Sequence, residues 1–310
     1  MRKGKAMEAV KLVELMGTVI EMKVGHPEAE ALLEKSEAKL RDYEYRFSAN
    51  RDDSMLMQVN QAAGKAAVAV DEDLFDLIQL AKKVSVSTEG RFNLAIGPLV
   101  KLWHIGFSDA RVPSQEEIDE GLDLIDPHKV QLDPTTHKVY LEKEGMEIDL
   151  GAIAKGYFAD QIVADWRQAG ADYGLINLGG NVLVMGDAPN REDGFWRIGI
   201  QRPDAIRGEI MATVPVKNQS VVTSGIYERS FKQEGRSYHH ILDSKTGYPI
   251  ETDLASLTII APQSVFCEIW TTALFALSSE EAVAAIDDLK GIEGLVVTQA
   301  GKILVSRALA

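Results

Sequence analysis

Hydrophobic and polar positions in the first part of the chain change from the period of a strand to the period of a helix. Residues 14–24 (ELMGTVIEMKV) alternate and are rich in β-branched side chains, which predicts a strand. Apolar side chains then recur at spacings of three and four residues over 28–45 and again over 74–84. These two segments are therefore predicted to be amphipathic helices.

The rest of the chain is predicted to be rich in strands. Further β-rich stretches separated by glycine, asparagine, aspartate and proline turns occupy residues 139–141, 146–150, 175–185, 196–201, 209–216, 254–260 and 294–305. The first two are expected to pair as a hairpin, and the last to be a hairpin in itself. Helical spacing returns over 154–168 and 264–277. We therefore predict an α+β fold in which helices pack on a largely antiparallel sheet.

Composition favours one globular unit. The 310 residues show no internal repeat and no low-complexity linker, so we expect a single domain with two lobes over 1–310, whose residues 1–13 form a flexible tail. The net charge of −14, from 33 basic and 47 acidic side chains, repels nucleic acid and anionic lipid. No run of about 18 apolar residues is present, so no transmembrane segment is expected.

The N-terminus and the cysteine content indicate the compartment. Arg2, Lys3 and Lys5 resemble the start of a secretory leader, but charged residues interrupt the apolar run that should follow. With no leader and no lipobox cysteine, a cytoplasmic protein is expected; an extracytoplasmic, membrane-anchored protein is the alternative if a leader was removed. The single cysteine, Cys267, excludes an intramolecular disulfide and a thiolate zinc cluster.

The densest group of polar residues lies between Ser220 and Pro249. His239 and His240 are adjacent, and Asp243 begins a segment, 243–247, with the composition of a tight turn. If the histidines lie on a strand they point to opposite faces, so at most one of them can face a given site. A structural turn and a catalytic segment are both open on these residues alone.

A second candidate segment runs from Asp149 to Asp160 (DLGAIAKGYFAD). It places an acid, small residues and then Lys155 in the first turn of a predicted helix, where free N–H groups and a lysine could neutralise a phosphate. Neither this segment nor residues 177–181 (NLGGN) has the spacing of a P-loop or of a dinucleotide-binding fold. The alternative is a strand-to-helix joint relieved by glycine.

The third candidate lies in the predicted helix 264–277. Glu268 and Thr272 are four residues apart and so share one face of this otherwise apolar helix. A carboxylate and a hydroxyl are hard oxygen ligands that suit Mg²⁺, and a buried acid is costly unless it is paired or binds a metal. A capping or solvent-facing glutamate is the alternative.

Together these segments resemble the ApbE family of FAD:protein FMN transferases. Five motifs occur in the family's order across nearly the whole chain: 16–18 (MGT), 97–103 (GPLVKLW), 149–156 with Asp160, 177–180 (NLGG), and 240–247 after 223–225 (TSG). The resemblance implies a T-fold-like α+β structure, bound FAD and a magnesium ion at its pyrophosphate.

The resemblance also implies roles for individual residues. Met16 would lie against the flavin, and the main chain of 91–93 near the adenosine or the ring edges. The implied FAD contacts are Met16, Asn50, Arg91, Phe92, Asn93, Asp149, Lys155 and the main chain at Leu242. The implied metal ligands are the carbonyl oxygen of Ala152, Glu268 and Thr272.

In the implied reaction a threonine hydroxyl of a flavin-acceptor protein attacks the FMN-side phosphorus of FAD, AMP leaves, and FMN stays on the acceptor as a phosphoester. His240 is the candidate base for that hydroxyl. Asp243 either orients His240 or acts at the edge of the metal site. Because FAD carries two negative phosphates and the chain carries a charge of −14, Mg²⁺ and Lys155 must supply positive charge locally.

Three residues depart from the family pattern. Glu268 stands where many members have aspartate, Asn93 replaces an aspartate, and Asn50 replaces an aromatic residue. Loose binding of FAD would favour hydrolysis to FMN and AMP, so an FAD pyrophosphatase and a non-catalytic FAD-binding protein are the alternatives. A serine hydrolase using Ser224 lacks the G-x-S-x-G elbow, and an acidic scaffold that binds no flavin is the remaining hypothesis.

Overall fold

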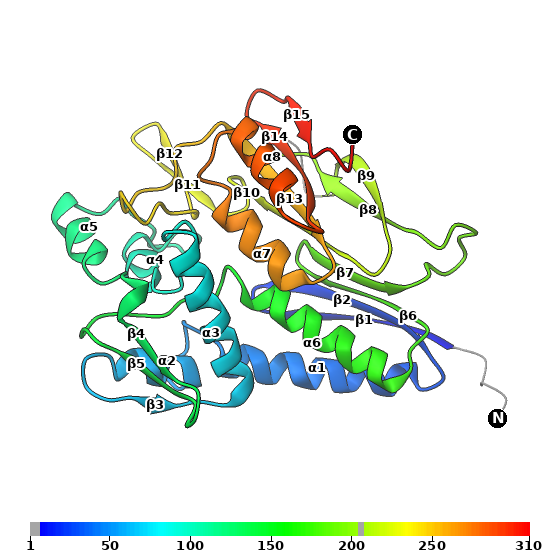
Figure 1. Ribbon diagram of the computed structural model, residues 1–310, viewed down its shortest axis with the longest axis horizontal. Coiled ribbons are helices and arrows are strands. Elements are labelled where there is room, and N and C mark those ends of the chain that lie inside the picture. Colours follow the sequence, from blue (N-terminus) through cyan, green and yellow to red (C-terminus); the bar gives the residue numbers. More distant parts are fainter. Residues whose placement is uncertain (1–6, 204–207) are drawn as a thin grey trace.

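One large antiparallel sheet organises the chain. The computed structural model describes residues 7–203 and 208–310 (Figure 1). The sheet has eight strands in the order β1-β2-β6-β7-β10-β13-β14-β15, and every neighbouring pair is antiparallel. Their bounds are Met7–Leu15, Thr18–His26, Tyr173–Leu178, Asn181–Gly186, Ser220–Gly225, Leu254–Ala261, Glu293–Thr298 and Ile303–Val305. This arrangement confirms the predicted α+β class.

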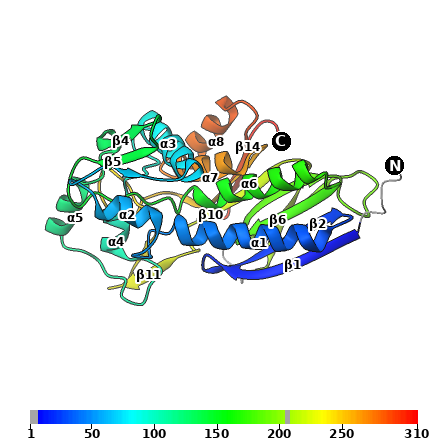
Figure 2. The same ribbon diagram turned by 90° about the horizontal axis from the view of Figure 1, so that it is seen from below.

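Four helices cover one face of this sheet (Figures 1 and 2). Helices α1 (Ala29–Arg46) and α6 (Ala154–Ala169) lie over β1, β2, β6 and β7, while α7 (Ser264–Ala273) and α8 (Ser279–Asp288) lie over β10, β13, β14 and β15. The main core forms where the apolar stripe of α1 and α6 meets β2. Leu40, Trp166 and Met22 are all fully buried there. Burial of these amphipathic faces is what stabilises the helices.

The other elements form three smaller groups. Residues 55–141 add α2 (Met55–Gln61), β3 (Val68–Ala69), α3 (Glu72–Ser87), α4 (Gly97–Trp103), α5 (Gln115–Leu122), the 3₁₀ turn η1 (Pro127–Lys129), β4 (Val130–Asp133) and β5 (Lys138–Leu141). Strands β8 (Trp196–Gln201) and β9 (Ile210–Val216) pair with each other and share a core with the second face of the sheet. Strands β11 (Ser230–Gln233) and β12 (Arg236–His239) form a separate ribbon. Within the described ranges no helix combines the length and the apolar content needed to cross a bilayer.

Two hairpins replace single strands of the prediction. The stretch 14–24 is broken by a two-residue turn at Met16 and Gly17, whose φ angles are 54° and 69°, and residues 7–13 extend β1 instead of forming a tail. The stretch 175–185 is broken in the same way at Gly179 and Gly180, with φ of 67° and 107°. A turn of two residues leaves the alternation of buried and exposed side chains in phase before and after it, so the period alone does not reveal that the strand is interrupted. The rest of the predicted tail, residues 1–6, lies outside the described residues.

The hairpin predicted for 139–141 and 146–150 is wrong. Residues 138–141 form β5, which pairs with β3 and β4, and residues 146–150 join no strand. Ile148 is buried as a strand residue would be, but its backbone is satisfied by a side chain. Its N–H donates to Asn60 Oδ1 at 2.8 Å and its carbonyl accepts from Asn60 Nδ2 at 3.0 Å. One amide side chain therefore takes the place of a partner strand. The helix predicted to extend to residue 277 ends at Ala273.

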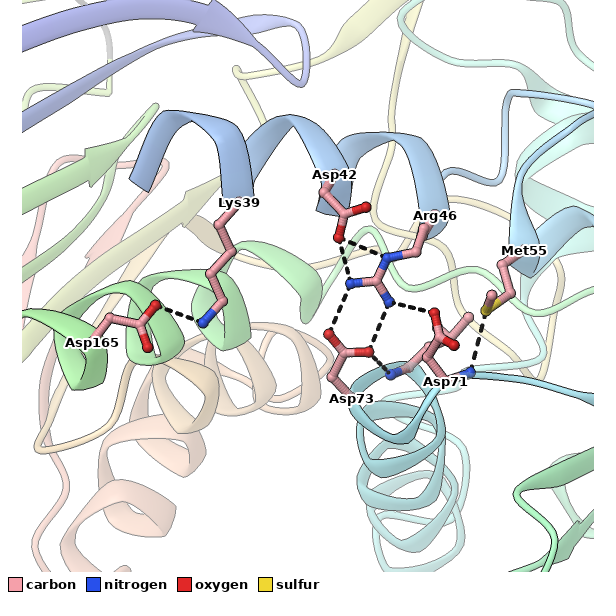
Figure 3. Close-up of polar contacts among 8 residues, drawn as sticks. Lys39, Asp42, Arg46, Met55, Asp71, Asp73 and Asp165 are labelled. Carbon is pink, nitrogen blue, oxygen red and sulfur yellow. Dashed lines mark hydrogen bonds and ion pairs between the residues drawn. The ribbon is translucent and has the colours of Figure 1, made fainter. Parts of the chain in front are cut away.

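An ion cluster fixes the end of α1 to the start of α3 (Figure 3). The guanidinium of Arg46 donates to Asp42 at 2.8 Å, to Asp71 at 3.1 Å and to both oxygens of Asp73 at 2.8 and 2.9 Å. Burial opposes ionisation of Asp73, but the bonds from Arg46 outweigh it and hold the pKa of that carboxyl below its usual value. A cavity of about 660 Å³ opens beside the cluster. Because each guanidinium nitrogen is used within the fold, we interpret the cluster as structural.

Candidate functional site

The two glycine-containing hairpin turns lie together at one end of the sheet. Strands β2 and β6 pair with Ile20 opposite Leu178, which brings the 16–18 turn beside the 177–181 turn. A Cβ on Gly179 would lie 2.3 Å from Thr18 Oγ1, so only glycine allows this approach. Met16 has a left-handed backbone, and its N–H donates to Glu44 Oε1 at 2.6 Å. The two sequence motifs are therefore one structural unit.

The start of α6 places Asp149 and Lys155 on either side of a tight turn. Asp149 Oδ1 accepts the Gly151 N–H at 2.7 Å, and the Asp149 N–H donates to the carbonyl of Leu94 at 2.9 Å. Burial raises the pKa of the Asp149 carboxyl, against the Gly151 N–H and the positive charges of Arg229 and Lys101. The segment 91–94 and the start of α6 are thereby held side by side.

Glu268 is buried on α7 where α6 and α7 touch. It is 6% exposed, and Asn181 Nδ2, at the start of β7, donates to its Oε1 at 2.8 Å. A Cβ on Gly156 would lie 2.8 Å from Glu268 Cγ, so glycine at this place on α6 permits the contact. Burial raises the pKa of the Glu268 carboxyl, while the charge of Lys155 and the bond from Asn181 lower it. Lys155 therefore lies close enough to Glu268 for its charge to act there.

The predicted metal donors come from α7 and from the turn before α6, two elements that touch at Glu268. Within the described part of the chain, neither Glu268 Oε2 nor the Thr272 hydroxyl forms a hydrogen bond. The neighbouring Thr271 hydroxyl, by contrast, donates to the Glu268 carbonyl at 3.0 Å. The Ala152 carbonyl belongs to the exposed turn one helical turn before Gly156. A free carboxylate oxygen, a hydroxyl and a carbonyl fit a hard cation such as Mg²⁺. Among the described residues, no three His, Cys, Asp or Glu side chains form a metal cluster.

The two adjacent histidines have different hydrogen-bond partners. His239 Nε2 donates to the Ile250 carbonyl at 3.0 Å and its Nδ1 accepts the Ile241 N–H at 3.3 Å, so both nitrogens are used in the fold. His240 Nδ1 lies 3.2 Å from the carbonyl of Arg229, which can only accept, so Nδ1 carries the proton. The lone pair of His240 is therefore on Nε2, to which no described residue bonds.

His240 lies close to the cations of the site. Burial, with smaller contributions from the positive charges of Arg229 and Lys155, lowers the pKa of His240 to about 4, although the bond to the Arg229 carbonyl opposes this shift. The imidazole is therefore neutral near pH 7 in the free protein. Lys155 acts electrostatically on both His240 and Glu268, which places these three predicted residues in one neighbourhood.

Asp243 begins a tight turn and forms no hydrogen bond with His240 in the described structure. Its Oδ1 accepts the Lys245 N–H at 2.8 Å, and its carbonyl accepts the Gly247 N–H at 2.8 Å. Trp103, fully buried at the end of α4, donates its indole N–H to the Gly247 carbonyl at 2.8 Å. The motif 97–103 thus supports the turn that follows His240. The turn interpretation is correct for the backbone, and it leaves Asp243 Oδ2 available.

Asn93 connects the 91–93 segment to this turn. Its Nδ2 donates to the Ile125 carbonyl at 2.8 Å and lies 3.4 Å from Ser244 Oγ, while its Oδ1 accepts the Ala95 N–H at 2.9 Å. The amide that stands where the family often has aspartate is thus used mainly to hold the loops. Its main-chain carbonyl accepts the Ile96 N–H at 3.3 Å, so its second Oδ1 lone pair and its main-chain N–H remain for a ligand.

Four residues predicted to contact FAD have no described contact with Lys155, His240 or Glu268. The Phe92 side chain is 2% exposed in the main core and its N–H donates to Thr88 Oγ1 at 3.2 Å, so neither group is free to bind FAD. Arg91 is exposed, with its Nε donating to the Thr88 carbonyl at 3.3 Å. Leu242 forms a bridge with Pro249 and packs near Trp103. Asn50 is exposed after α1, and no described contact joins it to the other predicted residues.

Three residues of the neighbourhood were not predicted as site residues. Asn181 holds Glu268 from a segment 87 residues away in sequence, and the positive charge of Arg229 lowers the pKa values of both Asp149 and His240. Asp160, noted only as part of a motif, caps α7 by accepting the N–H groups of Ser264 and Val265 at 2.8 and 2.9 Å. Burial raises its pKa to about 6. Asn181 could have been identified from its position directly after the paired glycines 179–180. Nothing in the sequence pattern indicated Arg229.

Comparison with known proteins agrees with this arrangement. Residues 16–296 match the ApbE family. A protein of Klebsiella pneumoniae (strain 342) named FAD:protein FMN transferase is 43% identical over 292 residues, 94% of this chain and 90% of that protein. A protein of the same name from Treponema pallidum (strain Nichols) is 38% identical, over 91% of this chain and 82% of that one.

Solved structures show the same fold. The ApbE protein from Thermotoga maritima superposes with a TM-score of 0.88 at 30% identity, covering 98% of both chains. The apo form of the flavinyl transferase ApbE from Pseudomonas stutzeri superposes with a TM-score of 0.85 at 26% identity, covering 100% of this chain and 98% of that one. Extent of the match, identity and fold agree, and the chain belongs to the ApbE family.

Proposed function

We propose that this ApbE-family protein transfers FMN from FAD to a threonine hydroxyl of an acceptor protein and releases AMP. One observation carries the proposal: His240 keeps a lone pair on Nε2 in a neighbourhood that also contains Lys155 and Glu268. Transfer of a phosphoryl group to a hydroxyl requires a neutral base for the hydroxyl proton, and a cation and a hard oxygen ligand near the phosphate.

FAD would lie across the joined loops. The flavin would contact the Met16 turn, and the pyrophosphate would lie at the start of α6, where Lys155 and the N–H groups of the first turn face it. Asp149 and the main chain near Asn93 are held together by the Asp149–Leu94 bond and would contact the nucleotide as a pair. Phe92 contributes packing to this arrangement and no direct contact.

Magnesium would be held by Glu268 Oε2, the Thr272 hydroxyl and the Ala152 carbonyl. When bound there, it would supply positive charge to the pyrophosphate that a protein of net charge −14 otherwise lacks. The chain's own part is to orient the donors: Asn181 fixes one oxygen of Glu268 and so directs the other away from the helix contact.

His240 would act on the acceptor. Nε2 takes the proton of the threonine hydroxyl as its oxygen bonds to the FMN-side phosphorus, and the bond from that phosphorus to the bridging oxygen breaks so that AMP leaves with it. The negative phosphates of bound FAD raise the pKa of the imidazole from about 4 towards neutrality, which improves it as a base at physiological pH. The Arg229 carbonyl keeps the ring in the required tautomer.

The test is an incubation of the protein with FAD and Mg²⁺, with and without a threonine-containing flavin-acceptor domain, in which AMP and acceptor mass are measured in parallel. AMP together with an acceptor heavier by one FMN supports the transferase. AMP without added mass indicates an FAD pyrophosphatase, which the exposed, uncontacted Asn50 would favour by leaving FAD loosely held. FAD bound without AMP in either tube indicates a binding protein.

The adjacent histidines provide a matched pair of variants. His240→Asn should keep FAD binding and lose about 10²–10⁴-fold in rate. His239→Asn should lower the melting temperature, because both of its ring nitrogens are bonded in the fold, and should keep the rate per folded molecule. Equal rates for His240→Asn and the wild type would remove the base from the mechanism.

A further inference from the structure

Strand β1 is an open edge of the eight-stranded sheet (Figure 2). Among the described strands it pairs with β2 alone, in a register that runs from Met7 opposite His26 to Leu15 opposite Thr18. A two-residue turn makes Leu15 and Thr18 a hydrogen-bonded pair, so residues 8, 10, 12 and 14 direct their N–H and C=O groups away from β2. Within the described ranges no backbone group bonds to this outer row.

The outer edge of β1 carries none of the features that usually prevent another strand from pairing. Edge strands are commonly protected by short length, a bulge, a proline or an outward-facing lysine. β1 has nine residues, an unbroken register and no proline. Its one lysine, Lys11, pairs with Glu37 of α1 on the helix side of the sheet. The opposite edge strand, β15, has only three residues, so β1 is the edge at which an extended chain can pair.

The face of β1 and β2 that lies away from the helices is apolar and uncovered. Val10, Leu12 and Val19 are 55%, 65% and 53% exposed there. Val10 and Leu12 are two apart on β1, and Val19 is the diagonal neighbour of Leu12 on β2, so the three side chains form one patch. The β8–β9 hairpin covers this side of β7, β10, β13 and β14, and its core includes no residue of β1 or β2. Adjacent exposed apolar side chains of this kind mark an interaction surface.

Two carboxylates border the patch at the end nearer Met16. Glu14 lies opposite Val19 and Glu21 opposite Leu12, so the two acids are diagonal neighbours on the same face. Neither forms an ion pair or a side-chain hydrogen bond within the described ranges, and their like charges repel each other. A strand that placed a lysine or arginine beside them would remove this repulsion while covering the apolar side chains.

The same charges disfavour a second copy of β1 as the added strand. In an antiparallel pair related by a two-fold axis, the register that sets Val10 opposite Leu12 also sets Glu8 opposite Glu14, twice. Like charges directly opposite each other destabilise a pair of strands. Charge therefore favours a partner of different sequence with basic residues.

We propose that the flavin-acceptor protein adds an extended segment to β1, with apolar side chains over Val10 and Leu12 and a basic side chain beside Glu14 and Glu21. This inference rests on the proposed function and names how the acceptor docks. Main-chain bonds to the outer row supply affinity, and alternate side chains supply specificity. Because β1 ends at Leu15, directly before the turn that carries Met16, the basic end of the added strand leads towards the bound flavin, and the target threonine follows it.

The first experiment compares Leu12→Lys with the control Ile303→Lys, which changes a side chain 49% exposed on the opposite edge strand, β15. FMN transfer to a threonine-containing flavin-acceptor domain is followed by mass over a range of acceptor concentrations, with FAD and Mg²⁺ saturating. Leu12→Lys removes apolar contact and adds a charge that repels a basic partner, so KM for the acceptor should rise about 10-fold or more. FAD binding should stay unchanged, and Ile303→Lys should resemble the wild type.

The second experiment measures docking without turnover, by hydrogen exchange of the backbone amides. The outward N–H groups of residues 10, 12 and 14 should exchange rapidly in the free protein and at least about 10-fold more slowly with the acceptor domain present. Exchange over β15 should not change. Slowing confined to β1 would support strand addition at this edge.

Three results would overturn the inference: equal KM values for Leu12→Lys and Ile303→Lys, no slowing over β1 with the acceptor domain, or slowing that appears without the acceptor as the protein concentration rises. The last result would assign the edge to a second copy of the chain. Absence of FMN transfer by the wild type would instead contradict the proposed function. Hydrogen exchange would then still show whether the domain docks on β1, so the two failures are distinguishable.

Discussion

Gly156→Ala would separate α6 from α7 at the point where Glu268 is held. The new Cβ would lie 2.6 Å from the Ser264 carbonyl oxygen, 2.7 Å from its carbon and 2.8 Å from Glu268 Cγ. Two of these three atoms belong to the backbone at the start of α7 and cannot rotate away. Alanine gains about 1 kcal/mol over glycine in a helix interior, but overpacking of this kind costs about 1–3 kcal/mol.

The larger cost should prevail, because relief requires α7 to shift and so weakens the bonds from Asp160 to its first turn. We expect a net loss of about 1–2 kcal/mol in the free energy of unfolding, measured by urea titration. The same shift moves Glu268, so the rise in melting temperature on addition of Mg²⁺ should also shrink.

Gly121→Ala is the matched control. This glycine is also helical, on α5, but its added Cβ would meet Leu99 Cδ2 at 2.7 Å, a methyl group at the end of a flexible side chain. The control should be close to neutral in stability and unchanged in its response to Mg²⁺. If Gly156→Ala matched this control in both measurements, close contact of the two helices would not be needed to hold Glu268.

The remaining predictions concern a carboxylate, an imidazole and an amide. Glu268→Gln keeps an acceptor for Asn181 but removes a buried charge whose pKa is raised, so the metal-free variant should be at least as stable as the wild type. Its advantage should grow as pH rises through the folded pKa, and Mg²⁺ should no longer raise its melting temperature in thermal scans. His240 must be neutral to act, so in a pH profile kcat/KM should fall only near pH 4, and the limb in kcat should lie higher because bound FAD raises the pKa. Asn60→Ala leaves two buried groups of Ile148 unpaired and should cost about 2–6 kcal/mol in urea unfolding, while a cost below about 1 kcal/mol would show that water replaces the amide.

Two long helices were predictable because their apolar faces decide their bounds, whereas α2, α4, α5 and α8, each of only 7 to 10 residues, were not predicted. The predicted helix 28–45 is observed as α1 and 154–168 as α6, each within one residue at either end. The hairpins at 16–17 and 179–180 could not be predicted from the period, because a two-residue turn preserves the alternation. The 146–150 segment was predicted wrongly, because the amide of Asn60, far away in the sequence, forms the backbone hydrogen bonds that a neighbouring strand would otherwise form. Periodicity indicates which side chains are buried, but it does not indicate which groups form hydrogen bonds with the backbone of those residues.

Some features of the candidate site could likewise be predicted from local spacing, and others depend on contacts between residues distant in sequence. Glu268 and Thr272 share a helix face by spacing alone, so their proximity could be predicted. The choice between His239 and His240 depends on bonds to Ile250 and Arg229, whose positions follow from the fold. The use of Asn93 to hold loops together likewise depends on contacts that are distant in sequence, here 32 and 151 residues away.

The most direct test of the account is a crystal structure of the protein with FAD and Mn²⁺ in place of Mg²⁺, with the metal located by its anomalous signal. The account predicts an anomalous peak coordinated by Glu268 and Thr272, the pyrophosphate beside Lys155 at the start of α6, and His240 Nε2 facing the FMN-side phosphorus. A metal bound elsewhere, or an FAD whose phosphates lie away from His240, would contradict it.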